Sequence, residues 1–148
     1  DYKLVLCGSV RDEGAKLQEL CKELFIDDKI IFTGFIPDYD LPYFYNASEL
    51  FIYPSLYEGF GIPILEAYAC HCPVALSNTS CFPEIAGDAA VYFDPYSISS
   101  MSEAITKVIY NEEKRSQLIR LGNERLKRYS WEKAAQKTEE AYQKAIQS

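Results

Sequence analysis

Apolar residues fall into short runs and helical stripes that alternate along the first two thirds of the chain. Each short run is closed by a glycine, a proline or polar residues, which is typical of buried parallel strands. These predicted strands are Lys3–Gly8, Lys29–Thr33, Leu50–Tyr53, Val74–Ser77 and Ala90–Phe93. Apolar side chains at helical spacing separate them. The helices predicted from this spacing are Ala15–Ile26, Leu41–Ala47 and Ile62–Cys70.

Beyond residue 95 the pattern predicts helices only. Ser100 forms a capping box with the glutamate three residues later and would start the first of them. Asn111 would cap a second helix that runs toward residue 129, with Gly122 as its weak point. Ser130 would cap the last helix, Trp131–Gln147.

Strands that alternate with helices predict an α/β fold, in which helices cover both faces of a parallel sheet and a helical tail follows. Such folds bind ligands in the loops at the carboxyl ends of their strands. The candidate ligand-binding loops are therefore those that follow Gly8, Thr33, Tyr53 and Ser77.

Composition narrows the class of protein. The 148 residues suffice for one domain, and the apolar fraction of 48% with 25% charged residues is globular. The formal net charge of -7 argues against nucleic-acid binding, because an acidic surface repels phosphate backbones. No apolar run approaches the roughly 20 residues that a membrane span requires.

The cysteine pattern indicates a reducing compartment. Five cysteines without paired spacing argue against a disulfide framework, so we expect the cytoplasm, or the inner face of a membrane for the full-length protein. Cys70-His71-Cys72 invites a zinc hypothesis, but adjacent side chains in an extended segment point apart and no second ligand pair exists. We expect no metal, and His71 is interpreted as a surface loop residue.

The loop after the third predicted strand carries the candidate chemistry. It reads Pro54-Ser-Leu-Tyr-Glu-Gly-Phe-Gly-Ile-Pro-Ile-Leu-Glu-Ala67. Its glycines allow a ligand to approach the backbone, and the helix that begins at Ile62 offers free amides and a positive dipole end to an anion. Glu58 precedes the glycines and Glu66 lies about one turn into the helix. A bound diphosphate would thus place one carboxylate near each of its attached groups. The alternative is a tight turn that binds nothing, with Glu66 on a solvated helix face.

The run PSLYEGFGIPILEAYAC…PVALSNTS…PEIAGDAA…FDP resembles the family-4 retaining glycosyltransferases. Glu58 and Glu66 have seven residues between them, which is the E-x7-E signature of that family. The resemblance extends back through LVLCG and FTGFI and forward into YSWE, so it covers nearly the whole chain.

This resemblance implies the second, donor-binding half of a GT-B enzyme with two facing Rossmann-like domains. By analogy, Glu58 contacts hydroxyls of the transferred sugar and Glu66 takes the ribose hydroxyls. The backbone amides offered to the sugar and diphosphate would be those of Gly59, Phe60, Gly61 and Ile62. The backbone around Gly34, Phe35 and Ile36 would frame the base. The family transfers sugar from a nucleotide diphosphate sugar with retention of configuration, generally without a metal.

Two departures from the family pattern matter. His71 stands where the family usually has glycine, so it must accept an unusual backbone angle. The family's donor half normally opens with a strand that ends in Gly-Arg and a helix that bears a lysine, and this chain begins after them. The only arginine before the signature is Arg11, which we assign to a solvent-facing loop. We therefore expect residues 1–148 to be a donor-binding domain truncated at its N-terminal side, inactive alone, with the domain for a glycan or lipid-linked acceptor absent.

Three classes of function stay open: a glycosyltransferase donor domain, a nucleotide-binding module without catalysis, and an α/β interaction domain whose loop binds nothing. A missing first strand would also leave unpaired edges on the strands at 3–8 and 50–53. These edges could close on each other, accept a strand from a neighbouring molecule and so form an oligomer, or be filled by chain that is not present here.

Overall fold

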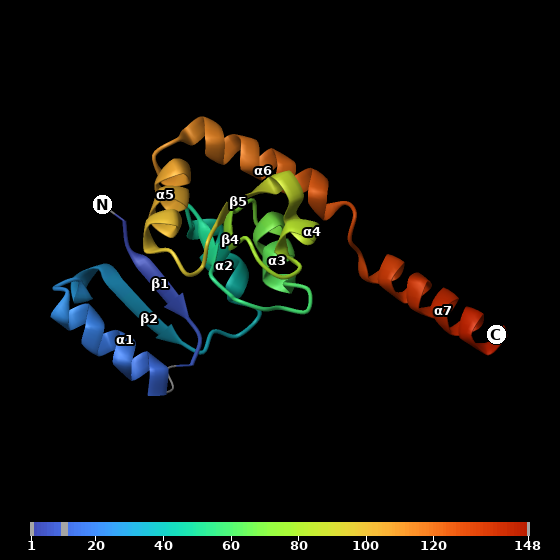
Figure 1. The fold of residues 1–148 in the computed structure, drawn as a ribbon, viewed down its shortest axis with the longest axis horizontal. Helices are drawn as coiled ribbons and strands as arrows, with labels where there is room; N and C mark the ends of the chain where they lie inside the picture. Colours follow the sequence, from blue (N-terminus) through green and yellow to red (C-terminus); the bar gives the residue numbers. More distant parts are fainter. Residues whose placement is uncertain (1, 10–11, 148) are drawn as a thin grey trace. The chain divides into compact units, whose positions relative to one another are not determined.

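A computed structural model describes residues 2–9 and 12–147 of the chain, with the backbone alone for residues 12 and 13. Arg11, predicted to lie in a loop, falls outside the described residues. The chain divides into two compact units, Asp1–Leu41 and Pro42–Ser148. Each unit combines parallel strands with helices (Figure 1).

The first unit is built on two parallel strands. Its elements are β1 (Leu4–Cys7), α1 (Asp12–Glu23), the 3-10 turn η1 (Asp27–Lys29) and β2 (Ile30–Gly34). The Thr33 hydroxyl donates to the Leu6 carbonyl at 3.3 Å and ties the strands together beyond their backbone ladder. At their carboxyl ends Gly8 and Gly34 have φ of 135° and 69°, so glycine is needed where both strands stop.

The second unit holds a three-stranded parallel sheet in the order β3-β4-β5. Its elements are α2 (Leu41–Ala47, which starts at the unit boundary), β3 (Phe51–Tyr53), α3 (Ile62–Ala69), β4 (Val74–Ser77), α4 (Phe82–Ala86), the 3-10 turn η2 (Gly87–Ala89), β5 (Ala90–Phe93), α5 (Ile98–Ile109), α6 (Glu112–Leu126) and α7 (Trp131–Gln147).

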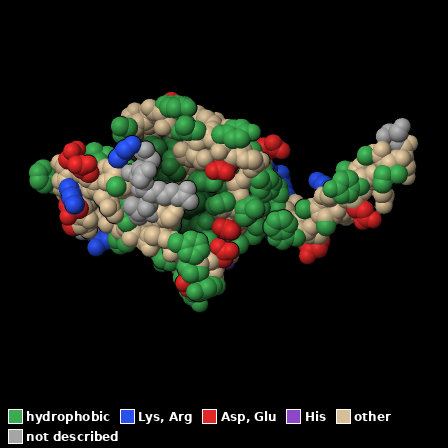
Figure 2. Space-filling model, turned by 90° about the horizontal axis from the view of Figure 1, so that it is seen from below, with side chains coloured by type: hydrophobic (Ala, Val, Ile, Leu, Met, Phe, Trp, Pro, Cys, Tyr) green, Lys and Arg blue, Asp and Glu red, His purple; other side chains and the backbone are tan. Residues whose placement is uncertain are grey.

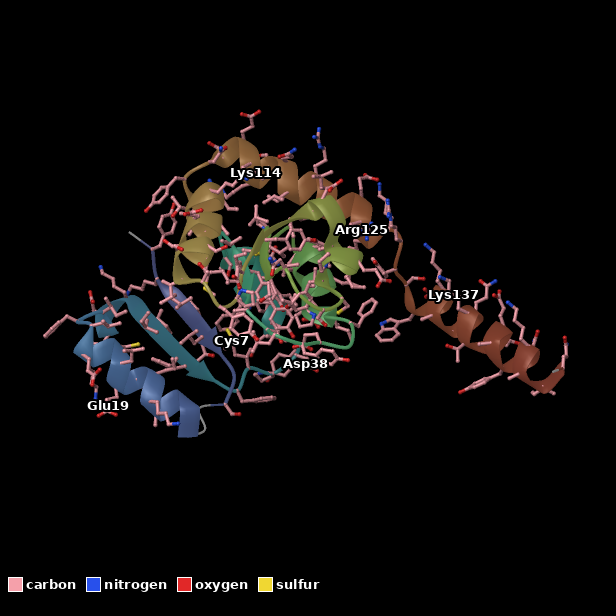
Figure 3. The ribbon with its side chains drawn as sticks, in the orientation of Figure 1. Cys7, Glu19, Asp38, Lys114, Arg125 and Lys137 are labelled. Carbon is pink, nitrogen blue, oxygen red and sulfur yellow. The ribbon has the colours of Figure 1, made fainter. Side chains whose placement is uncertain are left out.

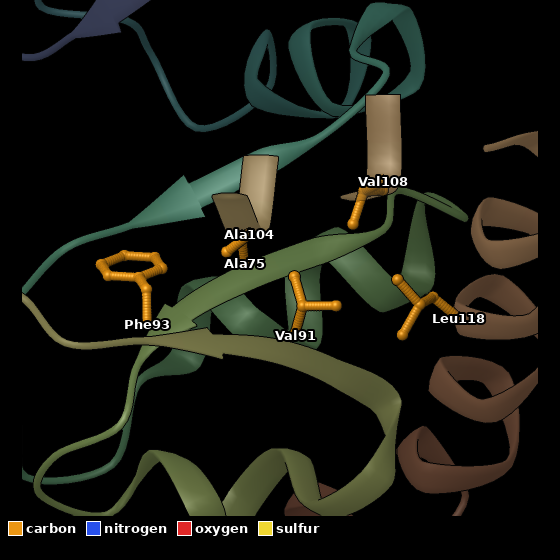
Figure 4. Close-up of a cluster of buried hydrophobic side chains, with 6 residues drawn as sticks. All are labelled: Ala75, Val91, Phe93, Ala104, Val108 and Leu118. Atoms are coloured by element: carbon orange, nitrogen blue, oxygen red, sulfur yellow. The ribbon is translucent and has the colours of Figure 1, made fainter. Parts of the chain in front are cut away.

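Alternation along the strands divides the core of the second unit between the two faces of its sheet. One face contributes Ala75, Val91 and Phe93, which pack against side chains of α5 and α6 (Figure 4). The helical members of this cluster are Ala104, Val108 and Leu118. On the opposite face Val74 and Leu76 are fully buried, and α3 lies over β4 there. Helices thus cover both faces, as the alternation of strands and helices predicts.

Two helix starts differ from the sequence prediction. α5 begins before Ser100, because the Ser97 hydroxyl accepts from the Ser100 amide at 3.2 Å and caps the helix one turn earlier. The short helix α4 was not predicted at all. By contrast, the Asn111 side chain accepts from the Lys114 amide at 2.9 Å, and Ser130 accepts from the Lys133 amide at 3.2 Å, so both predicted caps are confirmed.

The strands are all parallel, as predicted, but among the described residues they form two sheets and not one. β1 is hydrogen-bonded to β2 in the first unit, and β3 is hydrogen-bonded to β4 in the second. α7 buries none of its residues, and Figure 2 shows apolar, acidic and basic side chains together on its surface. Within the described ranges, no helix has both the length and the apolar character to cross a membrane.

Candidate sugar-nucleotide site

The loop from Pro54 to Gly61 joins the carboxyl end of β3 to the start of α3. Gly61 is the N-cap of α3 with φ 93° and ψ 52°, and a Cβ there would lie 3.1 Å from both Ile64 and Phe82. Only glycine fits this position without strain. No side chain caps α3. Pro63 has no amide N–H and the Ile64 amide donates to the Gly61 carbonyl at 3.0 Å, so the Ile62 amide is the one that the start of α3 itself can offer to a ligand.

The Glu58 carboxylate is anchored by two hydroxyl groups. Its Oε1 accepts from the Tyr53 hydroxyl at 2.7 Å and from the Ser55 hydroxyl at 2.9 Å. Burial, together with the hydrogen bond to Glu58 and its charge, raises the pKa of Tyr53 well above its ordinary value. Tyr53 is therefore a protonated, permanent donor to Glu58 at any physiological pH.

The Glu66 carboxylate is anchored in the same way from another element. Its Oε2 accepts from the hydroxyl of Tyr45, a buried residue of α2, at 3.0 Å. Glu66 itself is half-buried on α3. The orientation of the Glu66 carboxylate is thus determined by a contact between α2 and α3 that joins residues 21 positions apart in the sequence.

Three aromatic rings connect the two anchored carboxylates. The Tyr45 ring meets Phe51 edge-on at 5.3 Å between centroids, and Phe51 lies 5.6 Å from Tyr53. Phe51 and Tyr53 are two apart on β3 and so share one face of the strand. The structure therefore brings Glu58 and Glu66 to the same side of β3.

A second loop, after β4, holds the backbone of the first. The Ser80 hydroxyl donates to the Glu58 carbonyl at 2.8 Å and accepts from the Glu58 amide at 3.2 Å. The Cys81 thiol lies 3.3 Å from the Glu58 carbonyl and 3.2 Å from that of Phe60. Thr79 reaches the Leu56 carbonyl at 3.3 Å. The glycine-containing loop is thus held by side chains at several points.

Arg125 of α6 and Tyr129, which follows this helix, contact α4 and the loop that holds Glu58. Arg125, near the end of α6 (Figure 3), donates to the carbonyls of two α4 residues, Ile85, at 2.7 Å, and Glu84. Tyr129 donates to the Ile85 carbonyl at 3.3 Å, and its ring meets Phe60 edge-on at 5.6 Å. A contact therefore runs from the C-terminal side of α6 to the Phe60 side chain in the loop.

The residues expected to frame a base lie in the first unit. Gly34 ends β2, and its carbonyl accepts from the Gly8 amide at 2.9 Å. Phe35, which follows, is 77% exposed. That Gly34, Phe35 and Ile36 belong to the same site as Glu58 stays a prediction.

The Cys70-His71-Cys72 segment turns the chain out of α3. His71 has φ 55°, as its place in a glycine position requires, and its Nδ1 lies 3.0 Å from Asn123 Oδ1. Cys72 is buried against the carbonyls of Ser48 and Pro73, and burial raises the pKa of its thiol to about 12. In the part of the chain that the structure describes, no three His, Cys, Asp or Glu side chains are grouped to hold a metal ion.

The chain is similar in sequence to known proteins. Residues 1–125 match the model of the family Glycosyl transferases group 1. O-antigen chain mannosyltransferase B of Escherichia coli is 38% identical over 141 residues, which are 95% of this chain and 37% of that protein. Mannosylfructose-phosphate synthase of Agrobacterium fabrum is 32% identical over 124 residues, 82% of this chain and 27% of that one. The chain thus spans well under half the length of these relatives.

Solved structures show the same fold. Sucrose-phosphate synthase from Thermosynechococcus elongatus aligns with a TM-score of 0.88 at 24% identity, over 97% of this chain and 38% of that one. The C-terminal domain of a glycosyl transferase group 1 family protein from Francisella tularensis aligns with a TM-score of 0.70 at 28% identity, over 78% and 61% respectively. The fold is that of one half of a GT-B glycosyltransferase. With the family model matching 125 of its 148 residues, the chain belongs to the glycosyl transferases group 1 family.

Proposed function

We propose that this chain is the donor-binding part of a glycosyltransferase that transfers a sugar from a nucleotide diphosphate sugar to an acceptor, with retention of configuration. The observation that carries the proposal is the pair of anchored carboxylates, Glu58 and Glu66, on either side of the uncapped start of α3. Together they offer hydroxyl acceptors on both sides of an anion-binding helix end.

Each group has a distinct part in this proposal. The amides of Gly59, Phe60, Gly61 and Ile62 receive the diphosphate and adjoining sugar oxygens, Glu66 accepts from the ribose hydroxyls, and Glu58 accepts from the sugar that is transferred. Gly34, Phe35 and Ile36 border the base. The departing diphosphate is stabilised electrostatically by the helix end and by protein cations, so the reaction requires no metal.

The relatives suggest which donors to test first. The names of two relatives, O-antigen chain mannosyltransferase B and mannosylfructose-phosphate synthase, both refer to a mannosyl group. A mannose donor is therefore the leading candidate, with a glycan or lipid-linked acceptor bound by parts of the protein outside this chain. We place the reaction in the cytoplasm or at the inner face of a membrane, and we expect the 148-residue chain to be inactive alone.

NMR titration of the chain with GDP-mannose, UDP-glucose and ADP-glucose tests the binding step. Amide shifts should centre on residues 59–62 and saturate at millimolar concentration. Affinity should be weak because the chain carries a net charge of -7, and charge-assisted contacts to phosphate are the strong ones. Shifts confined to residues remote from this loop would contradict the site.

Two substitutions separate binding from turnover in the full-length enzyme. Glu66→Ala should weaken nucleotide affinity about tenfold or more, since ribose hydroxyls lose a charged acceptor. Glu58→Ala should lower kcat more than nucleotide affinity, because it acts on the sugar that is transferred. An equal loss of nucleotide affinity in both variants would refute this division. Binding without turnover in the full-length protein would favour a non-catalytic nucleotide-binding module.

A further inference from the structure

We propose that Tyr53 and Tyr45 are positioning residues of the donor site, each of which orients one carboxylate and leaves that carboxylate's second oxygen to the donor. Tyr53 acts on Glu58, and Tyr45 acts on Glu66. The proposal rests on the function proposed above. It assigns to Tyr53 a role in turnover and to Tyr45 a role in nucleotide binding.

Glu58 needs an anchor because of where it lies. Its side chain has several rotatable bonds and extends from a loop between Pro54 and Gly61 that has no regular secondary structure. If a ligand has to order a flexible side chain, the conformational entropy that is lost weakens its binding. A side chain that is already ordered by the protein carries no such cost on binding. The hydroxyls of Tyr53 and Ser55 order the Glu58 side chain in advance, both at Oε1.

Tyr53 is well placed to be that anchor. It is the last residue of β3, in register with Leu76 of the central strand β4. Its ring packs between Phe51, at 5.6 Å, and Phe82, at 5.1 Å between centroids. The hydroxyl is therefore held on a rigid element, while the group it orients lies on a loop.

Tyr45 does the same for Glu66 from a different direction. It is buried, and its ring is fixed edge-on against Phe51 at 5.3 Å. The hydrogen bond to Oε2 at 3.0 Å selects one orientation of a glutamate that α3 alone would leave free. Phe51 thus supports both tyrosine rings.

Each anchored carboxylate keeps one oxygen available. Among the described residues, no donor is hydrogen-bonded to Oε2 of Glu58 or to Oε1 of Glu66. An ionised carboxylate accepts several hydrogen bonds, so these oxygens are the ones that can receive sugar or ribose hydroxyls. Both tyrosine hydroxyls donate hydrogen bonds to the carboxylates, and neither tyrosine is proposed to touch the reacting atoms.

The test removes each hydroxyl and keeps each ring. Tyr53→Phe should lower kcat of the full-length enzyme about tenfold and change the affinity for the free nucleoside diphosphate less than twofold. Tyr45→Phe should weaken nucleoside diphosphate affinity several-fold, in the enzyme and in the 148-residue chain. Tyr96→Phe and Tyr43→Phe are matched controls, since both side chains are more than 70% exposed and neither touches a carboxylate of the site.

A double-mutant cycle distinguishes positioning from a general structural effect. In a Glu58→Gln background, Tyr53→Phe should cause little further loss of kcat, because its action passes through Glu58. The same tenfold loss in both backgrounds would overturn the proposal, as would a lowered melting temperature that accounts for the loss. If the wild-type protein binds no nucleotide diphosphate sugar, the proposed function fails and this inference with it. If it binds and both tyrosine variants behave like the controls, the positioning role alone is wrong.

Discussion

His71 occupies the left-handed position that ends α3. The Cys72 amide bonds to the Ala67 carbonyl at 2.9 Å and the His71 amide to that of Tyr68 at 3.0 Å, which is a Schellman motif with histidine where glycine is usual. A Cβ in this conformation costs about 1 kcal/mol. His71→Gly should therefore be about 1 kcal/mol more stable than His71→Ala, since both lose the contact with Asn123. Urea denaturation of the two variants measures the difference, and equal stabilities would show that the backbone is not strained.

At the scale of single residues, the sequence predicts the acidic pair but not what anchors it. Glu58 and Glu66 stand out because glycines and a helix start lie between them. Tyr53 and Tyr45 look like core aromatic residues, and the bond from Tyr45 to Glu66 joins positions 21 apart, which no local pattern encodes. The same holds for Ser80, whose bonds to the Glu58 backbone span 22 residues.

Among the elements, α6 shows how packing overrides local preference. Gly122 was expected to weaken this helix, yet α6 continues through it from Glu112 to Leu126. A Cβ at Gly122 would lie 2.5 Å from the ring of Tyr68. That ring is 2% exposed and is tied to the Ala89 carbonyl by a hydrogen bond at 3.2 Å, so it has no room to move away. Glycine is present because α3 and α6 approach each other here.

Gly122→Ala should consequently destabilise the protein although alanine is the better helix former. Overpacking costs about 1–3 kcal/mol, against a gain of about 1 kcal/mol in helix propensity. Ser116→Ala on the exposed side of the same helix is the control and should be neutral or slightly stabilising. Thermal unfolding of both variants decides the matter, and a stabilised Gly122→Ala would mean that Tyr68 can move aside.

The elements that were predicted within a residue are those whose signal is local and unambiguous. Val74–Ser77 and Ala90–Phe93 match the structure because each is a short apolar run with clear ends. The capping box at Ser100 predicts a start of α5 that is one turn too late, because the Ser97 hydroxyl accepts from the Ser100 amide and caps the helix. α4 was missed since five residues are too few to establish a helical period.

For the whole molecule, the pairing of strands is the property that sequence periodicity could not supply. Alternation predicts parallel strands but does not say how many sheets they form, and here β1 pairs only with β2 while β3 pairs only with β4. β1 and β3 each keep one edge without a partner strand among the described residues. Whether these edges pair with each other, with a neighbouring molecule or with other parts of the protein stays a prediction.

The unpaired edge of β1 should make the first unit the less stable of the two. Cys21 is the only buried residue described in this unit, whereas all four residues of β4 are fully buried. Two strands with so small a core are marginal in water.

In native-state hydrogen exchange, amides of Leu4–Cys7 and Ile30–Gly34 should exchange at least about tenfold faster than those of Val74–Ser77, a difference of about 1.4 kcal/mol in opening free energy. Repeating the measurement at higher protein concentration tests pairing between molecules, because such pairing would raise protection in β1 with concentration and would appear as a dimer in sedimentation. Equal protection of β1 and β4 in a dilute monomer would show that the open edge does not weaken the first unit.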